Sequence, residues 1–538
     1  MPDLLKRLDA RAERGFSMFL VIMAMFVTMM FVAAAFAAAN GDLPVAGVAT
    51  ERKSDYAAAE AGLGYYLNRL QQDPDYWTKC DTAPPNATEK NPVNQVNSNP
   101  LNLRWRQVTP GSKTDLDQYA IELLPVSPAT TCDTKNQATF VDQATGTFKI
   151  RVSGRTSDKA TRIRQIIATF RRDSFLNFVY FTNYENRDPA AESSATERQR
   201  QSTACANKYR SERADDNCTE IQFATGDEIN GPLHTNDESV LVCGSPVFGR
   251  TTNMDGSSRD KTDATEVRGN APGWVSKCTG SNPTINNVAN DNKIVSKARM
   301  LALPESNKML IDVAKLSASL YTGLTYIRLT GTTMTITNNG STTTKNFPTN
   351  GVLYVQNDVT CEGETPTAAD YANEPASCGN VYVSGTYGKS LTIAAENDVI
   401  ITPTQGASSP DITEVAGTDA TLGLIANNFV RVAHRVGSNC GANQSPVYNN
   451  VTIHAAILAL QHSFIVDNYQ CGARMADLTV RGAIVQKYRG PVGTSSPTGY
   501  IKNYWYDDRF RYRSPPYFLT PVAASWDVVR QHEVVKGS

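Results

Sequence analysis

Cysteine is the residue of this chain whose chemistry is easiest to predict from its spacing. There are ten cysteines, an even number, and no two of them have the C-x-x-C spacing of a zinc ribbon or a thioredoxin-type motif. Sequence alone does not fix the connectivity, but in chain order the ten form five pairs of near neighbours, which are Cys80 and Cys132, Cys205 and Cys218, Cys243 and Cys278, Cys361 and Cys378, and Cys440 and Cys471. We therefore expect disulfides that close surface loops, each stabilising the fold by about 3 kcal/mol for a loop of about 15 residues.

The histidines and the glycine-rich segments predict no catalytic or metal site. His234, His434, His454, His462 and His532 show no metal-ligand spacing. The sequence GKS at 388–390 resembles the end of a phosphate-binding loop, but the residues after it are typical of a strand, whereas that site requires the N-terminus of a helix. We therefore expect a protein that is not an enzyme and has no metal and no cofactor.

A run of aromatic and basic residues near the C-terminus is a candidate ligand contact. Arg509, Arg511 and Arg513 alternate with aromatic residues, so on a strand the three cations would share one face. Such a face could contact a surface ligand or hold single-stranded DNA. The alternative is a capping segment in which these arginines pair with neighbouring aspartates.

The elements that must position these residues are mostly strands. Alternation and β-branched content predict strands over 117–126, 146–154 and 162–172. Residues 185–220 are charged and predict a loop or a short surface helix. Asn339-Gly340 predicts the turn of a hairpin.

A loose repeat follows over residues 351–490. Short apolar runs alternate with Asn and Gly corners, and similar triplets recur at 357–359, 397–399, 427–429 and 462–464. Stacked rungs of this kind bury a continuous core that no single rung could close. The repeat predicts a right-handed parallel β-helix or a similar β-solenoid, with a β-sandwich as the alternative.

The N-terminal region is the most informative part of the chain. Residues 16–39 carry no charge, and a helix of that length spans about 36 Å, enough to cross a bilayer. The basic leader before it predicts a single pass through the inner or cytoplasmic membrane with the body outside the cytoplasm, where disulfides persist. The alternatives are a signal peptide cleaved near AAAFAAAN and a plain anchor.

The leader boundary Arg14-Gly15-Phe16-Ser17, followed by an apolar helix, resembles that of type IV prepilins and type II secretion pseudopilins, and AAAEAGLGYYLNRL at 57–70 is similar to PilX-type minor pilins. The resemblance implies that a prepilin peptidase cuts after Gly15 and methylates Phe16. It also implies that the membrane, other pilins and the pilus assembly machinery are partners, and that the protein reaches the pilus or cell surface.

One position departs from the pattern of the major pilins. These usually carry a glutamate at the fifth mature residue, and here that position is Leu20. In this family, subunits without the acid are typically at the growing tip. The resemblance therefore implies a minor, tip-located subunit that aids filament initiation and presents the exported domain. The alternative is a surface adhesin, or a DNA- or polysaccharide-binding protein, with one transmembrane helix.

Together these observations predict an α+β fold with a large all-β body. The length of 538 residues predicts several domains, and the net charge of −1 provides no bulk field for nucleic acid or acidic lipid. The expected divisions are a leader (1–15), a pilin-like helix (16–72, transmembrane over 16–39), a module with an antiparallel sheet (73–184), a loop-rich β region with a hairpin (185–350), the solenoid (351–490) and a C-terminal cap (491–538).

Overall fold

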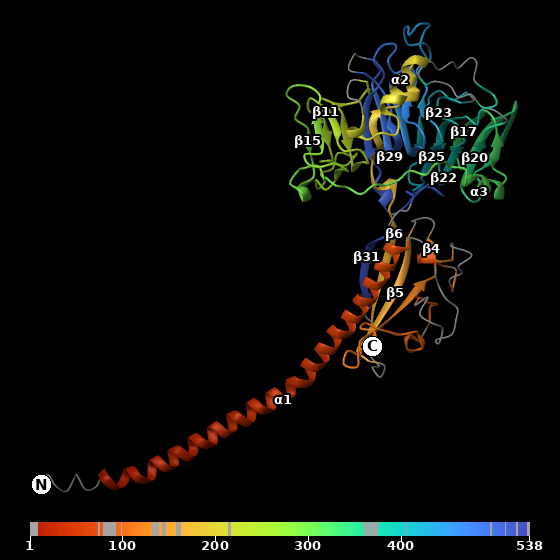
Figure 1. Ribbon diagram of the computed structural model, residues 1–538. Helices are drawn as coiled ribbons and strands as arrows, with labels where there is room; N and C mark the ends of the chain where they lie inside the picture. Colours follow the sequence, from red (N-terminus) through yellow and green to blue (C-terminus); the bar gives the residue numbers. More distant parts are fainter. Residues whose placement is uncertain are drawn as a thin grey trace. The chain divides into compact units, whose positions relative to one another are not determined.

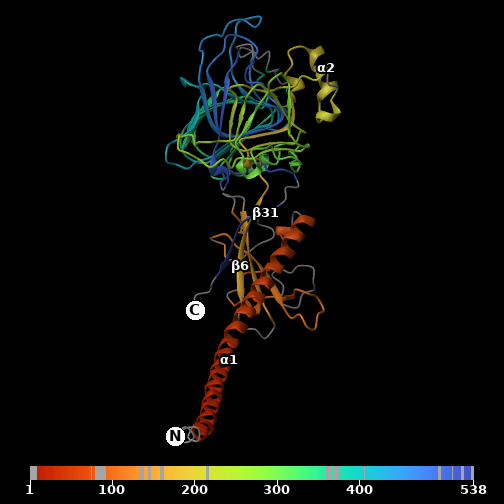
Figure 2. The ribbon, with the colours of Figure 1, turned by 90° about the vertical axis from the view of Figure 1, so that its left-hand side faces the viewer.

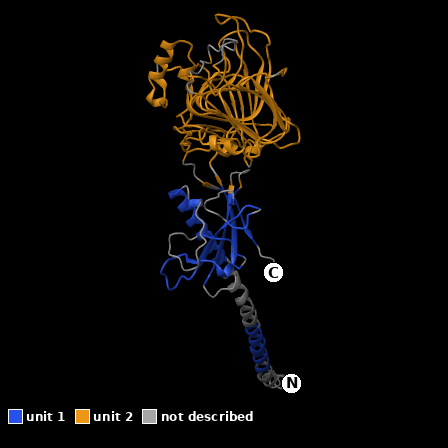
Figure 3. Ribbon diagram, turned by 90° about the vertical axis from the view of Figure 1, so that its right-hand side faces the viewer, with its two compact units in different colours: residues 1–141, 148–170, 528–538 blue, residues 142–147, 171–527 orange. Residues whose placement is uncertain are grey.

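The structure is a computed structural model (Figure 1). It describes residues 9–534 except 74–75, 79–92, 98, 128, 132–138, 143–146, 158–162, 214–216, 359–360, 362–365, 367–374, 405, 495–497, 512 and 523–525, and it leaves out the side chains of 9–17, 34–52, 172 and 527. The chain divides into two compact units, coloured separately in Figure 3. We call residues 1–141, 148–170 and 528–538 the helix–sheet unit, and residues 142–147 and 171–527 the β body.

The helix–sheet unit contains one long helix, α1 (Asp9–Gln72), which Figure 1 shows in red. It ends just before Asp73, as expected because the residue that precedes a proline disfavours the helical conformation. It continues through residues 40–44, although Gly41 and Pro44 disfavour the interior of a helix. In its last turns the side chains of Ala59, Leu63, Tyr66 and Leu70 are buried, and they form an apolar face with the half-buried Leu67.

Two glycines allow α1 to lie close to the sheet. A Cβ atom on Gly154, in strand β5 (Thr147–Arg155), would lie 2.1 Å from the backbone oxygen of Asp55 and 2.4 Å from the backbone nitrogen of Ala59. A Cβ atom on Gly62, in the helix, would lie 2.7 Å from Val152 Cγ1. The helix and the strand therefore pack at a separation that only glycine permits.

The sheet of this unit has the strand order β1-β3-β5-β6-β31, with β2 paired to β3 and β4 to β5. The remaining bounds are β1 (Val93–Asn94), β2 (Arg106–Gln107), β3 (Gln118–Leu124), β4 (Val141–Asp142), β6 (Arg164–Arg172) and β31 (Trp526–Val534). Strand β1 is parallel to β3, whereas β3 and β5 are antiparallel. The last strand comes from the C-terminus and is linked to β6 by the ion pair of Arg164 and Glu533 at 2.8 Å. In sequence, the β body is therefore an insertion between two adjacent strands of one sheet.

The β body begins with a helix and short strands. Their bounds are β7 (Tyr180–Arg187), α2 (Ala195–Cys205), β8 (Phe223–Ala224), β9 (Glu228–Asn230), β10 (Leu233–Thr235), β11 (Val240–Cys243), β12 (Val247–Phe248), β13 (Thr265–Val267), β14 (Trp274–Ser276) and β15 (Thr284–Ile285). It continues with α3 (Leu310–Leu316), β16 (Leu320–Thr322), β17 (Thr325–Gly331), β18 (Thr333–Asn338), β19 (Ser341–Asn346), β20 (Val352–Gln356), β21 (Val381–Tyr387), β22 (Leu391–Ala395), β23 (Val399–Ile401), β24 (Ile412–Glu414), β25 (Leu422–Ala426), β26 (Val430–Val432), β27 (Val451–Ala459), β28 (Phe464–Val466), β29 (Asp477–Arg489) and β30 (Ile501–Tyr506).

Most of these strands join a 21-stranded sheet, and β14, β11 and β8 form a separate one. Strand β7 lies between β10 and β29, parallel to both, so the first strand of the β body is also paired with one of its last. Chain segments about 300 residues apart are thus hydrogen-bonded neighbours. The first strand of the inserted β body is therefore hydrogen-bonded to a strand near its end.

The repeat seen in the sequence corresponds to strands in register. Val399, Val430 and Phe464 pair in parallel on β23, β26 and β28. Val399 also pairs with Val381, so the triplet 379–381 lies in a neighbouring rung, whereas Val359 of the predicted triplet 357–359 lies outside the described residues. The apolar side chains of these rungs form one buried core cluster.

The predicted fold class needs two corrections. A membrane-spanning helix needs about 20 apolar residues, and no helix in the described part of the chain is long and apolar enough to cross a bilayer. The transmembrane segment predicted over 16–39, and the single-pass location in the inner or cytoplasmic membrane, are therefore wrong.

The second correction concerns the sheets. The chain is mostly β, and both large sheets mix strand orientations. Parallel β1 joins the sheet predicted to be antiparallel. In the β body the hairpin predicted at Asn339-Gly340 is present, but it pairs antiparallel within the same sheet as the parallel rungs, so the body is neither a purely parallel solenoid nor a sandwich. The cause is local: Asn339 and Gly340 take positive φ angles of 49° and 74°, which favour a two-residue hairpin turn between β18 and β19.

Candidate functional site

Residues 188–220 of the β body form a segment that we call the α2 arm. Figure 2 shows α2 to one side of the strands of the body. The helix starts where the side chain of Ser194 accepts a hydrogen bond from the backbone N–H of Glu197 at 3.1 Å, which satisfies one of the free donors of the first turn. Asp188 caps the preceding turn by accepting a bond from the Ala190 N–H at 2.9 Å. The sequence allowed a short surface helix here, and the two caps explain its position.

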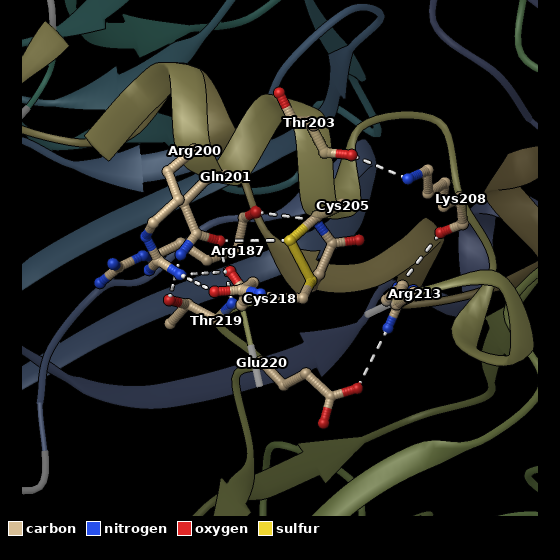
Figure 4. The surroundings of a disulfide bond; sticks show 12 residues. Arg187, Arg200, Gln201, Thr203, Cys205, Lys208, Arg213, Cys218, Thr219 and Glu220 are labelled. Carbon is tan, nitrogen blue, oxygen red and sulfur yellow. Dashed lines mark hydrogen bonds and ion pairs between the residues drawn. A yellow bond between two sulfur atoms is a disulfide. The ribbon is translucent and has the colours of Figure 1, made fainter. Parts of the chain in front are cut away.

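A disulfide between Cys205 and Cys218 holds the end of α2 (Figure 4). Beside it, Gln201 bonds twice to Thr219. Its Oε1 accepts from the backbone N–H at 2.9 Å, and its Nε2 donates to the hydroxyl at 2.8 Å. Lys208 Nζ donates to the carbonyl of Thr203 at 2.8 Å, which closes the turn after the helix. The arm is therefore fixed both covalently and by hydrogen bonds.

Buried charges join the base of the arm to the strands. Asp237 is fully buried and accepts hydrogen bonds from Arg213 and from the backbone N–H groups of Glu185 and Arg210. Glu220 lies 2.5 Å from Lys277 Nζ. Burial acts to raise the pKa of Glu220, but its hydrogen bond to Lys277 and the nearby cationic charges outweigh burial and lower it. The carboxylate is therefore ionised and anchors the arm.

The outer side of the arm carries a shallow groove of about 920 Å³. It is lined by Ala195, Thr196, Gln199, Arg200, Thr203, Ala204, Lys208 and Asn217. These side chains are small or polar, and the Arg200 guanidinium is already bonded to Glu197 and to Asn217. The groove presents the carbon atoms of these side chains together with the hydroxyls of Thr196 and Thr203.

The predicted disulfides are confirmed for eight cysteines. The structure pairs Cys205 with Cys218, Cys243 with Cys278, Cys361 with Cys378, and Cys440 with Cys471, as neighbours in the chain. Cys80 and Cys132 lie outside the described residues. Disulfide pairing thus follows chain order throughout the β body.

The three C-terminal arginines do not form the cationic strand face that the sequence predicted. Residues 508–511 form a short 3-10 helix instead of a strand. Arg509 lies 2.6 Å from Asp507 and 2.7 Å from Glu414, and is largely buried. Arg511 and Arg513 are more exposed, and each lies within 4 Å of an aspartate. This geometry matches the alternative of a capping segment with paired charges.

The processing residues and Leu20 lie in α1. Gly15 and Phe16 are within the helix, but their side chains are outside the described residues. Leu20 is 59% exposed, and its apolar neighbours Met18, Phe19 and Met23 are at least as exposed. This part of α1 therefore presents a continuous apolar surface, and such surfaces mark interaction sites.

Two features were missed from the sequence. The first is β31, whose alternation in WDVVRQHEV was read as part of a cap. The second is an ion pair of His462 and Asp188, at 3.1 Å, which joins the arm to the rungs. Its two residues are separated by 274 positions, so no local signal could have revealed it.

Comparison with known proteins gives one likeness. No family model matches the chain, and no curated protein matches it. Among solved structures, the crystal structure of the competence-associated pilin ComZ from Thermus thermophilus is similar over 91% of this chain and 98% of that chain, at 12% identity and a TM-score of 0.22. A pilin is thus among the structures that this chain is similar to. At that score the likeness carries no argument, and the PilX-type resemblance stays a prediction.

Proposed function

We propose that this protein is a minor subunit of a type IV pilus or a related filament, and that it presents its β body outward. The observation that carries the proposal is the contrast along α1. Its last turns bury Ala59, Leu63 and Tyr66 against the sheet of its own unit, whereas residues 18–33 leave large apolar side chains exposed. An apolar helix surface with no partner among the described residues of its own unit is suited to contact with other subunits.

The leader sequence supports a specific route into such a filament. A prepilin peptidase would cut between Gly15 and Phe16, which removes the charged residues that precede the apolar surface. Leu20 in place of an acid supports a position at the tip, where no earlier subunit offers an amine for pairing. The role is structural, and the proposal includes no catalysis.

Replacing Gly15 with a bulky residue tests this route. We expect Gly15→Leu to block processing and to reduce the number of filaments at least tenfold in cells that carry only the variant. The matched control is Gly41→Leu, which changes a glycine of α1 beyond the leader and should leave processing intact. Normal processing and normal filaments in Gly15→Leu cells would contradict the proposal.

A further inference from the structure

The rows of strands in the β body differ in how their outer sides are covered. In β23, β26 and β28 every residue is buried, and the same holds for β22 and β25. A strand points alternate side chains to opposite faces, so the outer faces of these strands are covered as well as the inner ones. The first residues of β27 and β29, and those of β30, alternate instead between buried and partly exposed. This row therefore has a partly exposed outer face.

Four side chains in register lie along that face, one on each of four neighbouring strands. His454 pairs with Arg481, Arg481 with Trp505, and Trp505 with Asn230. Residues in register point to the same side of a sheet, and neighbouring strands are about 4.8 Å apart. We call His454, Arg481, Trp505 and Asn230 the open ladder. It places an aromatic ring between a guanidinium and a carboxamide.

The ring of Trp505 is held in place by its neighbours. Its Nε1 donates to Asn503 Oδ1 at 2.7 Å, and Asn503 Nδ2 donates to the hydroxyl of Thr479 at 3.3 Å. Because the indole N–H is already bonded, the ring contributes its apolar face rather than a donor. A fixed, partly exposed aromatic face on a polar surface can stack against the apolar face of a ring-shaped ligand.

Two polar atoms of the open ladder have no hydrogen-bond partner within the described residues. Asn230 is 8% exposed, and its Nδ2 is buried and unbonded; Nδ1 of His454 is in the same state. A buried polar group without a partner destabilises the fold. Burial lowers the pKa of His454, and nearby Arg481 lowers it further, so the imidazole is neutral at neutral pH. Each of these two side chains therefore has one polar atom that the described residues leave unsatisfied, beside the partly exposed ring of Trp505.

The charge of the open ladder argues against nucleic acid. Its one cation, Arg481, lies 3.6 Å from the carboxylate of Asp507. Glu228, two residues before Asn230 in β9, is an exposed acid on the same face. Binding a phosphate backbone requires several uncompensated cations. The ladder is therefore better matched to an uncharged ligand.

We propose that the open ladder binds an uncharged polysaccharide, with one sugar ring stacked on the partly exposed ring of Trp505, beside Asn230 and His454. A chain of sugars can cross the strands, since the ladder offers one side chain per strand. This proposal does not depend on the filament role, because it concerns the β body alone.

Calorimetric titration of the full-length protein tests the site. The probes are linear hexasaccharides of glucose, mannose, galactose and N-acetylglucosamine, with a twelve-residue oligothymidylate as the charged comparison. We expect at least one hexasaccharide to bind. We also expect Trp505→Ala to weaken that binding at least tenfold, and Asn230→Ala to weaken it severalfold, while Trp505→Phe retains most of it. The matched control is Trp274→Ala on β14, a partly buried tryptophan outside the ladder, which should bind as the wild type does.

Three results would overturn the proposal. They are binding of none of the four hexasaccharides, unchanged binding by Trp505→Ala and Asn230→Ala, and binding of the oligothymidylate alone. Thermal unfolding of each variant shows whether it is folded. If Trp505→Ala is not folded, the comparison of Asn230→Ala with wild type decides the outcome.

Discussion

The helix–sheet unit buries its core against a single helix, whereas the β body buries its core between stacked strands. In the first, α1 lies so close to β5 that Gly154 leaves no room for a Cβ atom. In the second, buried apolar side chains repeat from rung to rung, and Arg431 lies among them at 0% exposure. The helix–sheet unit therefore depends on the close approach of two backbones. The β body depends on the pairing of its buried charges with charges of opposite sign.

The largest expected effect comes from breaking that compensation in the β body. Arg431 lies 2.8 Å from Asp467 and 3.1 Å from Asp398, and all three are buried. Arg431→Leu would leave two buried carboxylates without their cation, at a cost of about 3–5 kcal/mol. Hydrogen exchange should show that β23, β26 and β28 lose protection. The protection of the helix–sheet unit should not change.

The control for this prediction is Arg474→Leu, which removes an exposed arginine of the same unit. Its effect should stay within about 0.5 kcal/mol. Equal losses in the two variants would show that the core of the β body does not depend on the charge of Arg431.

A smaller effect is expected from filling the close approach in the helix–sheet unit. Gly154→Ala places a methyl group against the backbone of Asp55 and Ala59, and overpacking of this kind costs about 1–3 kcal/mol. Gly64→Ala, on the exposed side of α1 where nothing lies within 4 Å, should instead stabilise by about 1 kcal/mol. Hydrogen exchange of α1 measures both, and a stabilising Gly154→Ala would refute the close-packing account.

The sequence was informative where the signal was local. The apolar face of α1, the turn at Asn339-Gly340 and the disulfides between neighbouring cysteines all depend on short-range patterns, and the structure contains them. Strand β31 could not be predicted as a partner of β6, because about 350 residues separate them and alternation alone does not name a partner. The open ladder was hidden for the same reason. Its four side chains are brought together by register.

The smallest expected effect concerns pH and the contact of the α2 arm with the rungs. Burial acts to lower the pKa of His462, but the charge and hydrogen bond of Asp188 outweigh it, so the pKa is raised above 6.5. Asp398 raises it as well, and Lys487 lowers it. A raised pKa means that the ion pair stabilises fully below pH 6.5 and that this contribution is lost as pH rises through the higher folded value.

Hydrogen exchange of α2, corrected for the intrinsic rate, should therefore show less protection at pH 8 than at pH 6. His462→Gln should remove this dependence while Cys205–Cys218 still holds the helix. Protection that increases with pH in the wild type would contradict the assigned direction.

The central claim is that α1 is the filament-forming part of the chain and that the β body is the part presented. Mass spectrometry of the N-terminal peptide from a purified filament fraction tests it most directly. The account predicts a peptide that begins at a methylated Phe16, present in far fewer copies than the main filament subunit. A peptide that retains residues 1–15, or the absence of this protein from the filament fraction, would contradict it.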